Sequence, residues 1–556
     1  MRNPFARAVL LTVAMLAVGG FFLRSDLDVR SALLKTAATA REAMLLQKPI
    51  GHMDPAAAWE ADVAISIEHE TNSTAEDAPA TATGLLNSPH MICDFDRERL
   101  KRWQELFRLN ETFEYTKRYV QPVRKDIARK SVTKLDQAFL TDAVSIVDVN
   151  EQYETETCPE PLVVPVPKSP FPSTADASDF MFGVSTTYGR FTDPRTSPIN
   201  EWTYWLTDGR GNSNGGKLVL LLLDASDIEL EDTQTKLTSM GIDADVSRSD
   251  ASLIMAARYL ALTPRLYNHP DRGSRKWLVI CDDDTFFPSF HGLADKLAAY
   301  DHDFPMYIGT FSEDVNNVHR HGSQAFGGAG VFLSVPMAKI IADNFDSCKS
   351  ETKLAEANTG WGPQGDILLR KCIYENSEVR LTLLNDLWQL DLFGDPSGFY
   401  ESGLKPLSLH HYRGGMWHVA HPWHYTKVAS VCGEDCTLQR FRTADDFVIA
   451  NGFSVAYYPR GIDFDLGQVE ATFHAAPEDR GWNMDFALGP RRRSLAGTGR
   501  KMSWDLQEAS VNEDGSVSQV YVRKQDDWRW KNADGTAMSE RDGIVELVWL
   551  PEVSHV

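Results

Sequence analysis

With 556 residues, 43% of them hydrophobic and 10% aromatic, the chain is long enough for more than one domain and for a large core. Its formal net charge of −22 argues against nucleic acid as a partner, because a surface that binds phosphate backbones needs clustered Lys and Arg. Most of the excess acids are expected on a solvated surface, with a smaller share grouped at a site.

The N-terminus carries an apolar stretch of 16 residues, 8–23, preceded by Arg2 and Arg7. This stretch is shorter than the about 20 residues that span an average bilayer, so a signal-anchor in a thin membrane and a cleaved signal peptide both fit it. No small-x-small cleavage site follows, which favours the anchor. Because the positive charge precedes the stretch, we expect residues 1–7 in the cytoplasm and the remaining chain across the membrane.

Cysteines and sequons agree with a secretory compartment. Two Asn-x-Ser/Thr sequons begin at Asn72 and Asn110, and the seven cysteines allow three disulfides. Cys281, inside a predicted strand, would then remain a free, buried thiol. Spacing alone does not fix the connectivity, but it allows Cys93 with Cys158, Cys348 with Cys372, and Cys432 with Cys436.

Composition divides the rest of the chain into three parts. Residues 24–172 are expected to form a stem and linker, because they begin Ala-rich and polar and end in a Pro-rich run at 159–172. Residues 173–430 alternate between apolar strands and helices, an order that predicts an α/β domain with a mixed, doubly wound sheet. Residues 431–556 show short apolar or alternating segments between turn signals, which predict a β-rich appendage of unassigned function.

The α/β domain contains neither a GxGxxG motif nor a Walker lysine loop, so a Rossmann dehydrogenase or a P-loop enzyme is unsupported. Ligands of doubly wound sheets bind at the carboxyl ends of the strands. Two of the expected strands end in acids there. The expected strands are 180–185, 217–224, 277–281, 306–310 and 330–334, and the expected helices are 200–206, 253–262 and 292–300.

Three adjacent acids, Asp282, Asp283 and Asp284, follow the continuous apolar run at 277–281. Burying even one ionised carboxylate costs several kcal/mol, so a buried group of this kind needs a counter-charge. A divalent cation supplies it, and oxygen ligands favour Mg²⁺ or Mn²⁺, which also hold substrate phosphates. A solvated acidic turn is the alternative interpretation.

Four motifs in order resemble Fringe-like glycosyltransferases, the β1,3-transferases of glycosyltransferase family 31 that are related to core 1 β1,3-galactosyltransferases. The resemblance covers roughly residues 180–425, less than half of the chain. It implies a GT-A nucleotide-sugar-binding fold, Mn²⁺ or alternatively Mg²⁺, a UDP-sugar donor, a glycan or glycoprotein acceptor and an inverting mechanism. It also implies a single-pass type II Golgi membrane protein with a lumenal catalytic domain. The motifs are DDDTFF at 282–287, GGAGVFLS at 327–334, Asp366 six residues before Cys372, and LHH at 409–411.

The resemblance implies roles for the acids and for one histidine. Asp284 would bind the metal directly, together with His410. Asp282 would reach the metal, a metal-bound water or the ribose of the donor, and Asp283 would lie between these two acids at the metal or donor. His411 is the alternative to His410, because one residue of register decides which ring points inward.

The remaining candidates are one acid that would act as a base and three residues that would contact the donor. Asp366 matches the family's catalytic base, although this chain has Gln364-Gly365 where Fringe-type proteins have another acid, and a helix cap is the alternative role. Gly327 and Gly328 would let the backbone approach the donor sugar or acceptor, unless they only form a tight turn. Asp224 ends the strand that meets the uridine in this family, so it would bind base or ribose or cap the strand.

The sequence therefore predicts a Golgi-anchored, Mn²⁺-dependent, inverting UDP-sugar glycosyltransferase that forms a β1,3 bond. A second hypothesis is a Fringe-like module that binds glycans or protein without catalysis, which the intact acids and His410 disfavour. A third is a metal-dependent phosphohydrolase, which should need more metal ligands in the sheet crevice than the sequence offers.

Overall fold

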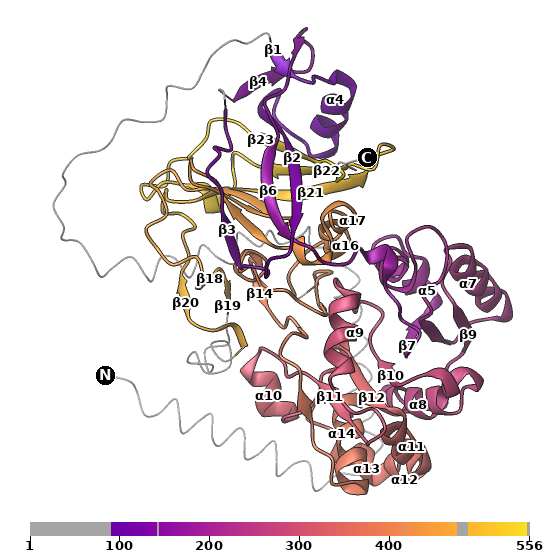
Figure 1. Cartoon of the computed structure of the whole chain (residues 1–556). Coiled ribbons are helices and arrows are strands. Elements are labelled where there is room, and N and C mark those ends of the chain that lie inside the picture. The colour runs from indigo at the N-terminus through magenta and orange to yellow at the C-terminus, as the bar shows by residue number, and fades with distance from the viewer. Residues whose placement is uncertain (1–90, 142–143, 416, 475–486, 553–556) are drawn as a thin grey trace, which may run out of the picture. The chain divides into compact units, whose positions relative to one another are not determined.

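The computed structural model describes residues 91–141, 144–415, 417–474 and 487–552. The expected anchor at 8–23 and the first part of the expected stem lie outside these residues. Within the described ranges, no helix is both long and apolar enough to cross a bilayer. Two large sheets organise this part of the chain (Figure 1).

The first sheet is mixed and seven-stranded, as expected for an α/β domain, with the order β13-β11-β12-β10-β7-β8-β9. Strands β7 to β10 are parallel, whereas β12 is antiparallel to both neighbours. The strands are β7 (Phe180–Thr187), β8 (Lys217–Leu223), β9 (Ala244–Arg248), β10 (Trp277–Ile280), β11 (Tyr307–Gly309), β12 (Val331–Ser334) and β13 (Thr382–Leu383). The strand order reverses between β7 and β10, and ligands of such sheets bind at this switch point, beyond the carboxyl ends.

Both faces of this sheet are covered. Leu278 and Ile280 of β10 pack with helices α8, α11 and α14, whereas Trp277 and Val279 join a core that includes α6, α7 and α9. Burial on both faces explains why this strand is a continuous apolar run. The helices of this part are α5 (Tyr188–Thr192), α6 (Ile199–Leu206), α7 (Asp227–Ser239), α8 (Met255–Tyr267), α9 (Phe290–Ala298), α10 (Val315–His321), α11 (Val335–Asp343), α12 (Phe345–Cys348), α13 (Glu351–Glu356) and α14 (Gly365–Asn376).

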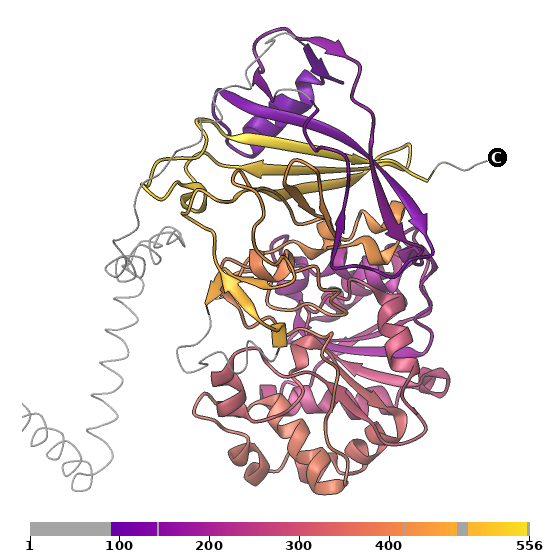
Figure 2. The same cartoon turned by 60° about the vertical axis from the view of Figure 1, so that its left-hand side comes forward.

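The second sheet has the order β3-β15-β16-β17-β21-β22-β23-β2-β4, with β6 also paired to β2. The β-rich character expected of residues 431–556 is present, but the sheet also takes four strands from the region assigned to the stem and linker. In Figure 2 the long indigo strand β2 runs beside the yellow C-terminal strands, and it is parallel to β23. The strands are β2 (Thr112–Lys125), β3 (Val132–Lys134), β4 (Ser145–Asp148), β6 (Leu162–Pro167), β15 (Arg440–Arg442), β16 (Phe447–Ala450), β17 (Ser454–Tyr457), β21 (Met502–Val511), β22 (Val517–Arg523) and β23 (Gly543–Trp549).

Short elements complete the described chain. One hydrophobic cluster contains residues of both large sheets, including Phe182 of β7 and Trp549 of β23. The remaining strands form three two-stranded pairs. These pairs are β1 (Met91–Cys93) with β5 (Glu154–Glu156), β14 (Phe393–Gly394) with β19 (Phe473–His474), and β18 (Val469–Ala471) with β20 (Arg491–Arg493); the other helices are α4 (Arg97–Leu106), α15 (Ser397–Tyr400), α16 (Pro422–Tyr425) and α17 (Ala429–Cys432).

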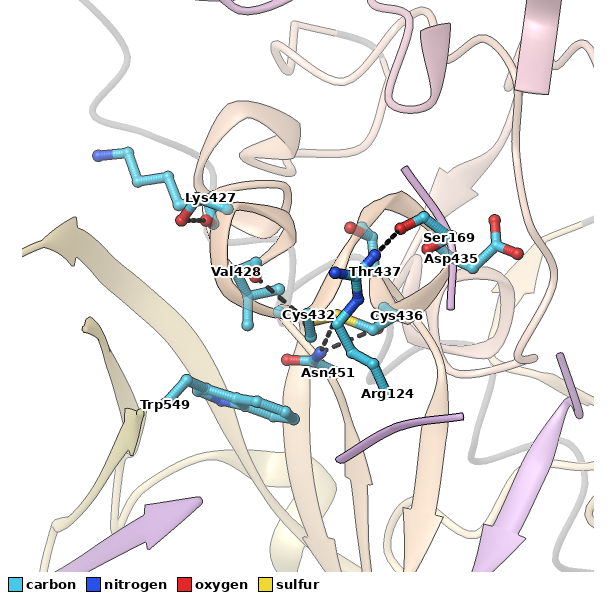
Figure 3. Close-up of a disulfide and its surroundings, with 12 residues drawn as sticks. Arg124, Ser169, Lys427, Val428, Cys432, Asp435, Cys436, Thr437, Asn451 and Trp549 are labelled. Atoms are coloured by element: carbon cyan, nitrogen blue, oxygen red, sulfur yellow. Dashed lines mark hydrogen bonds between the residues drawn. A yellow bond between two sulfur atoms is a disulfide. The ribbon is translucent and has the colours of Figure 1, made fainter. Parts of the chain in front are cut away.

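All three allowed disulfides are present, and Cys281 is a buried free thiol, so both expectations are confirmed. Figure 3 shows the bond between Cys432 and Cys436. Beside it, the Asp435 amide donates to the Ser169 hydroxyl at 3.1 Å. The disulfide thus closes a short loop in the segment that leads into β15.

Candidate active site

The acids after β10 are arranged by a tight turn. The Asp282 amide donates to the Thr285 hydroxyl at 3.0 Å, and that hydroxyl donates to the Gly328 carbonyl at 2.8 Å. One residue further on, Phe286 and Leu409 exchange backbone hydrogen bonds of 2.9 and 2.8 Å. This short antiparallel bridge brings the residue after Leu409 to the carboxyl end of β10.

The residue brought there is His410. Its Nε2 lies 3.1 Å from Asp284 Oδ1 and 3.4 Å from Asp282 Oδ2, and the three side chains offer ligand atoms that all lie within 4.8 Å of one another. The structure therefore brings together three of the expected metal-binding residues. Two carboxylate oxygens and an imidazole nitrogen form a group that could hold a metal ion.

Neighbouring positive charges keep the Asp284 carboxylate of this group ionised. Burial raises the pKa of Asp284, but the charge and hydrogen bond of His410, followed by the charge of Arg413, outweigh burial and leave it well below its usual range. Burial lowers the pKa of His410, but Asp284 and Asp282 outweigh it and leave the pKa well above the usual range. Without a metal ion, the protonated His410 ring thus supplies the positive charge between Asp282 and Asp284.

The other ring nitrogen of His410 gives a further test of the fit. Nδ1 is buried and has no hydrogen-bond partner in the described part of the chain. Metal-binding histidines usually donate this second N–H to an acceptor that fixes the ring. Here, packing fixes the ring instead, because a Cβ atom at Gly328 would lie 2.1 Å from the ring atoms Cε1 and Nδ1.

His411 points elsewhere. Its Nδ1 lies 2.7 Å from Asp391 Oδ1, and its ring stacks on Trp417 with centroids 4.3 Å apart. The backbone of His411 has a φ of 52°, a left-handed conformation that breaks the extended alternation of side chains at this residue. Of the two histidines, His410 therefore faces the acids.

Asp283 is engaged away from this group. Its carboxylate accepts hydrogen bonds from Arg190 Nε at 2.7 Å, from Arg190 Nη2 and from the Thr186 hydroxyl. The Asp283 side chain is buried, whereas 47% of the Arg190 side chain is exposed. The Asp283 carboxylate is thus occupied by Thr186 of β7 and Arg190 of α5, and it lies outside the group of Asp282, Asp284 and His410.

Asp366 lies at the start of α14, but not as its N-cap, which is Gln364. Its Oδ1 accepts the Gly327 amide at 3.0 Å, and the residue is half-buried. Burial, followed by the charge of Asp282, raises the pKa of Asp366 to about 7. A carboxylate with this pKa exchanges a proton near neutrality, as a general base requires.

The two glycines lie against protein side chains, whereas the sequence predicted a close approach to the donor sugar or acceptor, or a tight turn. A Cβ atom at Gly327 would lie 2.3 Å from the Tyr259 hydroxyl, and one at Gly328 would meet the His410 ring. These glycines therefore let the backbone approach protein side chains closely. Their amide and carbonyl groups in turn bind Asp366 and Thr285.

Asp224 lies on the same edge but outside the acidic group. It follows β8, two strands from β10, is exposed, has a φ of 56° and forms no hydrogen bond or ion pair with the described residues. A cavity of about 320 Å³ opens at the carboxyl ends of β8 and β9, against α8. Its lining includes Ser247 and the three arginines Arg248, Arg258 and Arg265.

A second group of possible ligands, Asp245, His269 and Asp271, has a different explanation. The ammonium of Lys217 lies 3.1 Å from Asp245 and 3.5 Å from Asp271, and its side chain is buried. The lysine is the cation of this cluster. Because Lys217 begins β8, the group lies at the amino end of the sheet, away from the expected ligand edge.

Sequence reasoning missed the residues that hold the site together. Arg190, Tyr259 and Asp391 belong to none of the motifs and lie far in sequence from Asp283, Gly327 and His411. The sequence predicts where β7 ends. In a parallel sheet, the segment that follows β7 would lie close to the end of β10. Nothing in the sequence marked which side chain of that segment would reach the acids.

A family model described as "Protein of unknown function, DUF604" matches residues 316–422, a range that contains Gly327, Gly328, Asp366 and His410. The comparison with curated proteins finds no match.

Solved structures that resemble parts of the chain include two glycosyltransferases. Mouse xyloside xylosyltransferase 1, in its apo form, aligns with 11% identity over 37% of this chain and 85% of its own, at a TM-score of 0.26. The glycosyltransferase GlyE of Streptococcus pneumoniae TIGR4 aligns with 17% identity over 41% of this chain and 53% of its own, also at 0.26. A likeness of this size supports no inference about the reaction of this chain.

Proposed function

We propose that the protein is a metal-dependent glycosyltransferase that transfers a sugar from a UDP-sugar to a glycan or glycoprotein acceptor. The observation that carries the proposal is the group formed by Asp282, Asp284 and His410 at the carboxyl end of β10. This group lies where the strand order reverses, the usual ligand site of an open α/β sheet. The resemblance to Fringe-like enzymes supports inversion and a β1,3 linkage.

The three side chains would hold Mn²⁺, or alternatively Mg²⁺, through two carboxylates and one imidazole. The ion would supply positive charge that offsets the negative charge on the departing UDP. Asp282 and Asp284 contribute two negative charges that the ion neutralises in part. The low pKa of Asp284 means that this acid needs no deprotonation before it binds the ion at neutral pH.

Asp366 would act as the base. The acceptor oxygen forms a bond to the anomeric carbon, its proton passes to the Asp366 carboxylate, and the bond from that carbon to the phosphate oxygen breaks. The Gly327 amide positions one carboxylate oxygen for this step. A pKa of about 7 makes the base strong enough to take the proton while leaving it largely ionised above neutrality.

We further propose that the protein is a single-pass type II protein of the Golgi membrane with a lumenal catalytic domain. One support is the apolar stretch at 8–23, which follows two arginines in the sequence. The other is the three disulfides, which are typical of oxidising compartments. Asn110, in the second sequon, is exposed, as a glycosylation site requires.

The test is UDP release by the purified full-length protein in detergent. A panel of UDP-sugars, with and without glycan acceptors, is assayed with Mn²⁺ or with EDTA. We expect Mn²⁺-dependent release from one donor and its loss in Asp284→Ala. Equal release in EDTA or in Asp284→Ala would contradict the proposal, release of free phosphate would favour a phosphohydrolase, and glycan binding without UDP binding would favour a non-catalytic module.

A further inference from the structure

We propose that Arg190 binds the diphosphate of the nucleotide-sugar donor and stabilises the charge that develops on the departing nucleoside diphosphate. This inference rests on the proposed function. It adds a cationic residue that belongs to none of the sequence motifs. The class of ligand group is a nucleoside diphosphate ester, recognised through its phosphate oxygens.

The fold places Arg190 at the switch point of the sheet. The Thr187 hydroxyl, at the end of β7, accepts the Arg190 amide at 3.2 Å and so begins α5. Strand β7 lies between β8 and β10, and its carboxyl end is next to the acids that follow β10. The guanidinium therefore extends from the segment after β7 to Asp283, which follows the neighbouring strand β10.

The guanidinium is oriented but only partly used. Nε and Nη2 donate to the two oxygens of Asp283, which fixes the plane of the group. Nη1 makes no hydrogen bond to any described residue, and 47% of the side chain is exposed. An arginine that only held Asp283 in place would not need a free N–H group that faces solvent beside two further carboxylates.

Other cations near the site are already occupied. Arg413 donates Nη1 to the Thr196 carbonyl and pairs through Nη2 with Glu201 at 3.2 Å, and 14% of its side chain is exposed. His410 lies between two acids and would bind the ion. Among the described basic residues that act on Asp283 or Asp284, Arg190 is the one with an exposed, unbonded donor edge.

Charge balance supports the same conclusion. Asp283 is neutralised by Arg190, and the charges of Asp282 and Asp284 are offset by a divalent ion. The donor's diphosphate then enters with charge of its own and gains another negative charge when the sugar–oxygen bond breaks, because the electron pair stays on the phosphate. A fixed guanidinium meets that charge without reorganisation. Asp283 is thus a positioning residue that acts through Arg190.

The experiment compares the full-length protein with Arg190→Gln, which removes the charge but keeps a hydrogen-bond donor toward Asp283. Mn²⁺ binding alone and UDP binding in the presence of Mn²⁺ are measured by calorimetry. We expect unchanged Mn²⁺ affinity and a loss of about 10- to 100-fold in UDP affinity, the usual size of a charged hydrogen bond. Arg190→Lys, which keeps the charge, should recover part of the loss. Arg210→Gln, on an exposed loop, is the matched control and should bind like the unchanged protein.

Two results would overturn the inference. The first is a UDP affinity of Arg190→Gln that stays within about twofold of the unchanged protein. A change this small is less than the loss of a charged hydrogen bond would cause, so the diphosphate would not contact this residue. Equal losses of Mn²⁺ and UDP affinity in both Arg190 variants would show that Arg190 only holds the acidic turn in place. If the unchanged protein binds UDP with Mn²⁺, either result leaves the proposed function intact. A failure of the unchanged protein to bind UDP would remove both.

Discussion

The imidazole of His410 lies directly against the backbone of Gly328, so that a Cβ atom at Gly328 would come within 2.1 Å of the ring. The same glycine accepts the Thr285 hydroxyl through its carbonyl at 2.8 Å. Gly328 therefore contacts both the acidic turn and the histidine that faces it. Space for the ring, and not an unusual backbone conformation, requires glycine at this position.

This contact predicts that Gly328→Ala displaces His410 and weakens the metal site. We expect Mn²⁺ affinity to fall by about 10- to 100-fold, the range seen when the support of a metal-binding histidine is lost. Calorimetric titration with Mn²⁺ measures the effect. Gly273→Ala is the matched control, because nothing lies within 4 Å of a Cβ atom there. Mn²⁺ affinity that is the same in both variants would contradict the assigned role of Gly328.

The substitution Asp366→Asn tests whether Asp366 acts as a base, because it leaves the hydrogen bond of this residue in the structure intact. Asparagine keeps an oxygen that accepts the Gly327 amide, but it cannot take a proton. We expect kcat to fall by about 10²- to 10⁴-fold, the usual contribution of a general base, with UDP and Mn²⁺ affinities kept. Steady-state kinetics and calorimetry check the two parts. A kcat that stays within the range of the unchanged enzyme would show that Asp366 only supports the start of α14.

The pH dependence of kcat/KM should carry the signature of the same residue. The base acts when ionised, so kcat/KM should rise with pH and level off above the pKa, which burial and Asp282 raise to about 7. A cation bound at Asp282 would oppose the effect of that acid, which places the midpoint at or below pH 7. A profile that falls as pH rises through this range would contradict a carboxylate base.

The pair of His291 and Glu434 should make stability depend on pH. His291 Nδ1 lies 2.9 Å from Glu434 Oε1, and this hydrogen bond, which outweighs burial, raises the pKa of His291 above its usual 6.5. The contribution is therefore fully present below about pH 6.5 and is lost as pH rises through the higher pKa of the folded state. Thr174 and Asp295 also face the ring and favour its charged form.

His291→Ala should accordingly reduce the free energy of unfolding more at pH 6 than at pH 9, because the charged form of the ring makes the stronger hydrogen bond to Glu434. Urea unfolding at the two pH values measures the difference. Glu434→Gln, which removes the charge of the partner, should abolish the same pH-dependent part. An equal loss for His291→Ala at both pH values would mean that only packing is removed.

Local patterns predict five of the seven strands of the first sheet, because these strands are largely apolar runs, and the acids after β10 follow one of them. They do not predict β9, whose sequence ADVSR is mostly polar, or β13, which has only two residues. Motif order predicts the place of His410, but which of the two rings faces the acids depends on the folded backbone, in which His411 has a left-handed conformation. Asp283 looked equivalent to its neighbours, and the arginine that engages it lies 93 residues earlier in the sequence.

The stem assignment failed for a different physical reason. Strand β2 mixes charged and apolar residues, six of its 14 residues are buried, and it pairs with β23 at the far end of the chain. Strand formation of this kind depends on long-range pairing and not on local propensity. The glycines show the same limit: the sequence indicated close approach at Gly327 and Gly328, whereas the identity of the neighbours, Tyr259 and His410, required the fold.

The measurement that tests the central claim most directly is UDP binding by the purified full-length protein with Mn²⁺ or with EDTA, beside Asp284→Asn. Removing one charged ligand of the ion should cost at least about tenfold in affinity. The account predicts UDP binding that requires Mn²⁺ and is weakened in Asp284→Asn. UDP binding that is unchanged by EDTA and by the substitution would contradict the assignment of Asp282, Asp284 and His410 as the metal site of a nucleotide-sugar transferase.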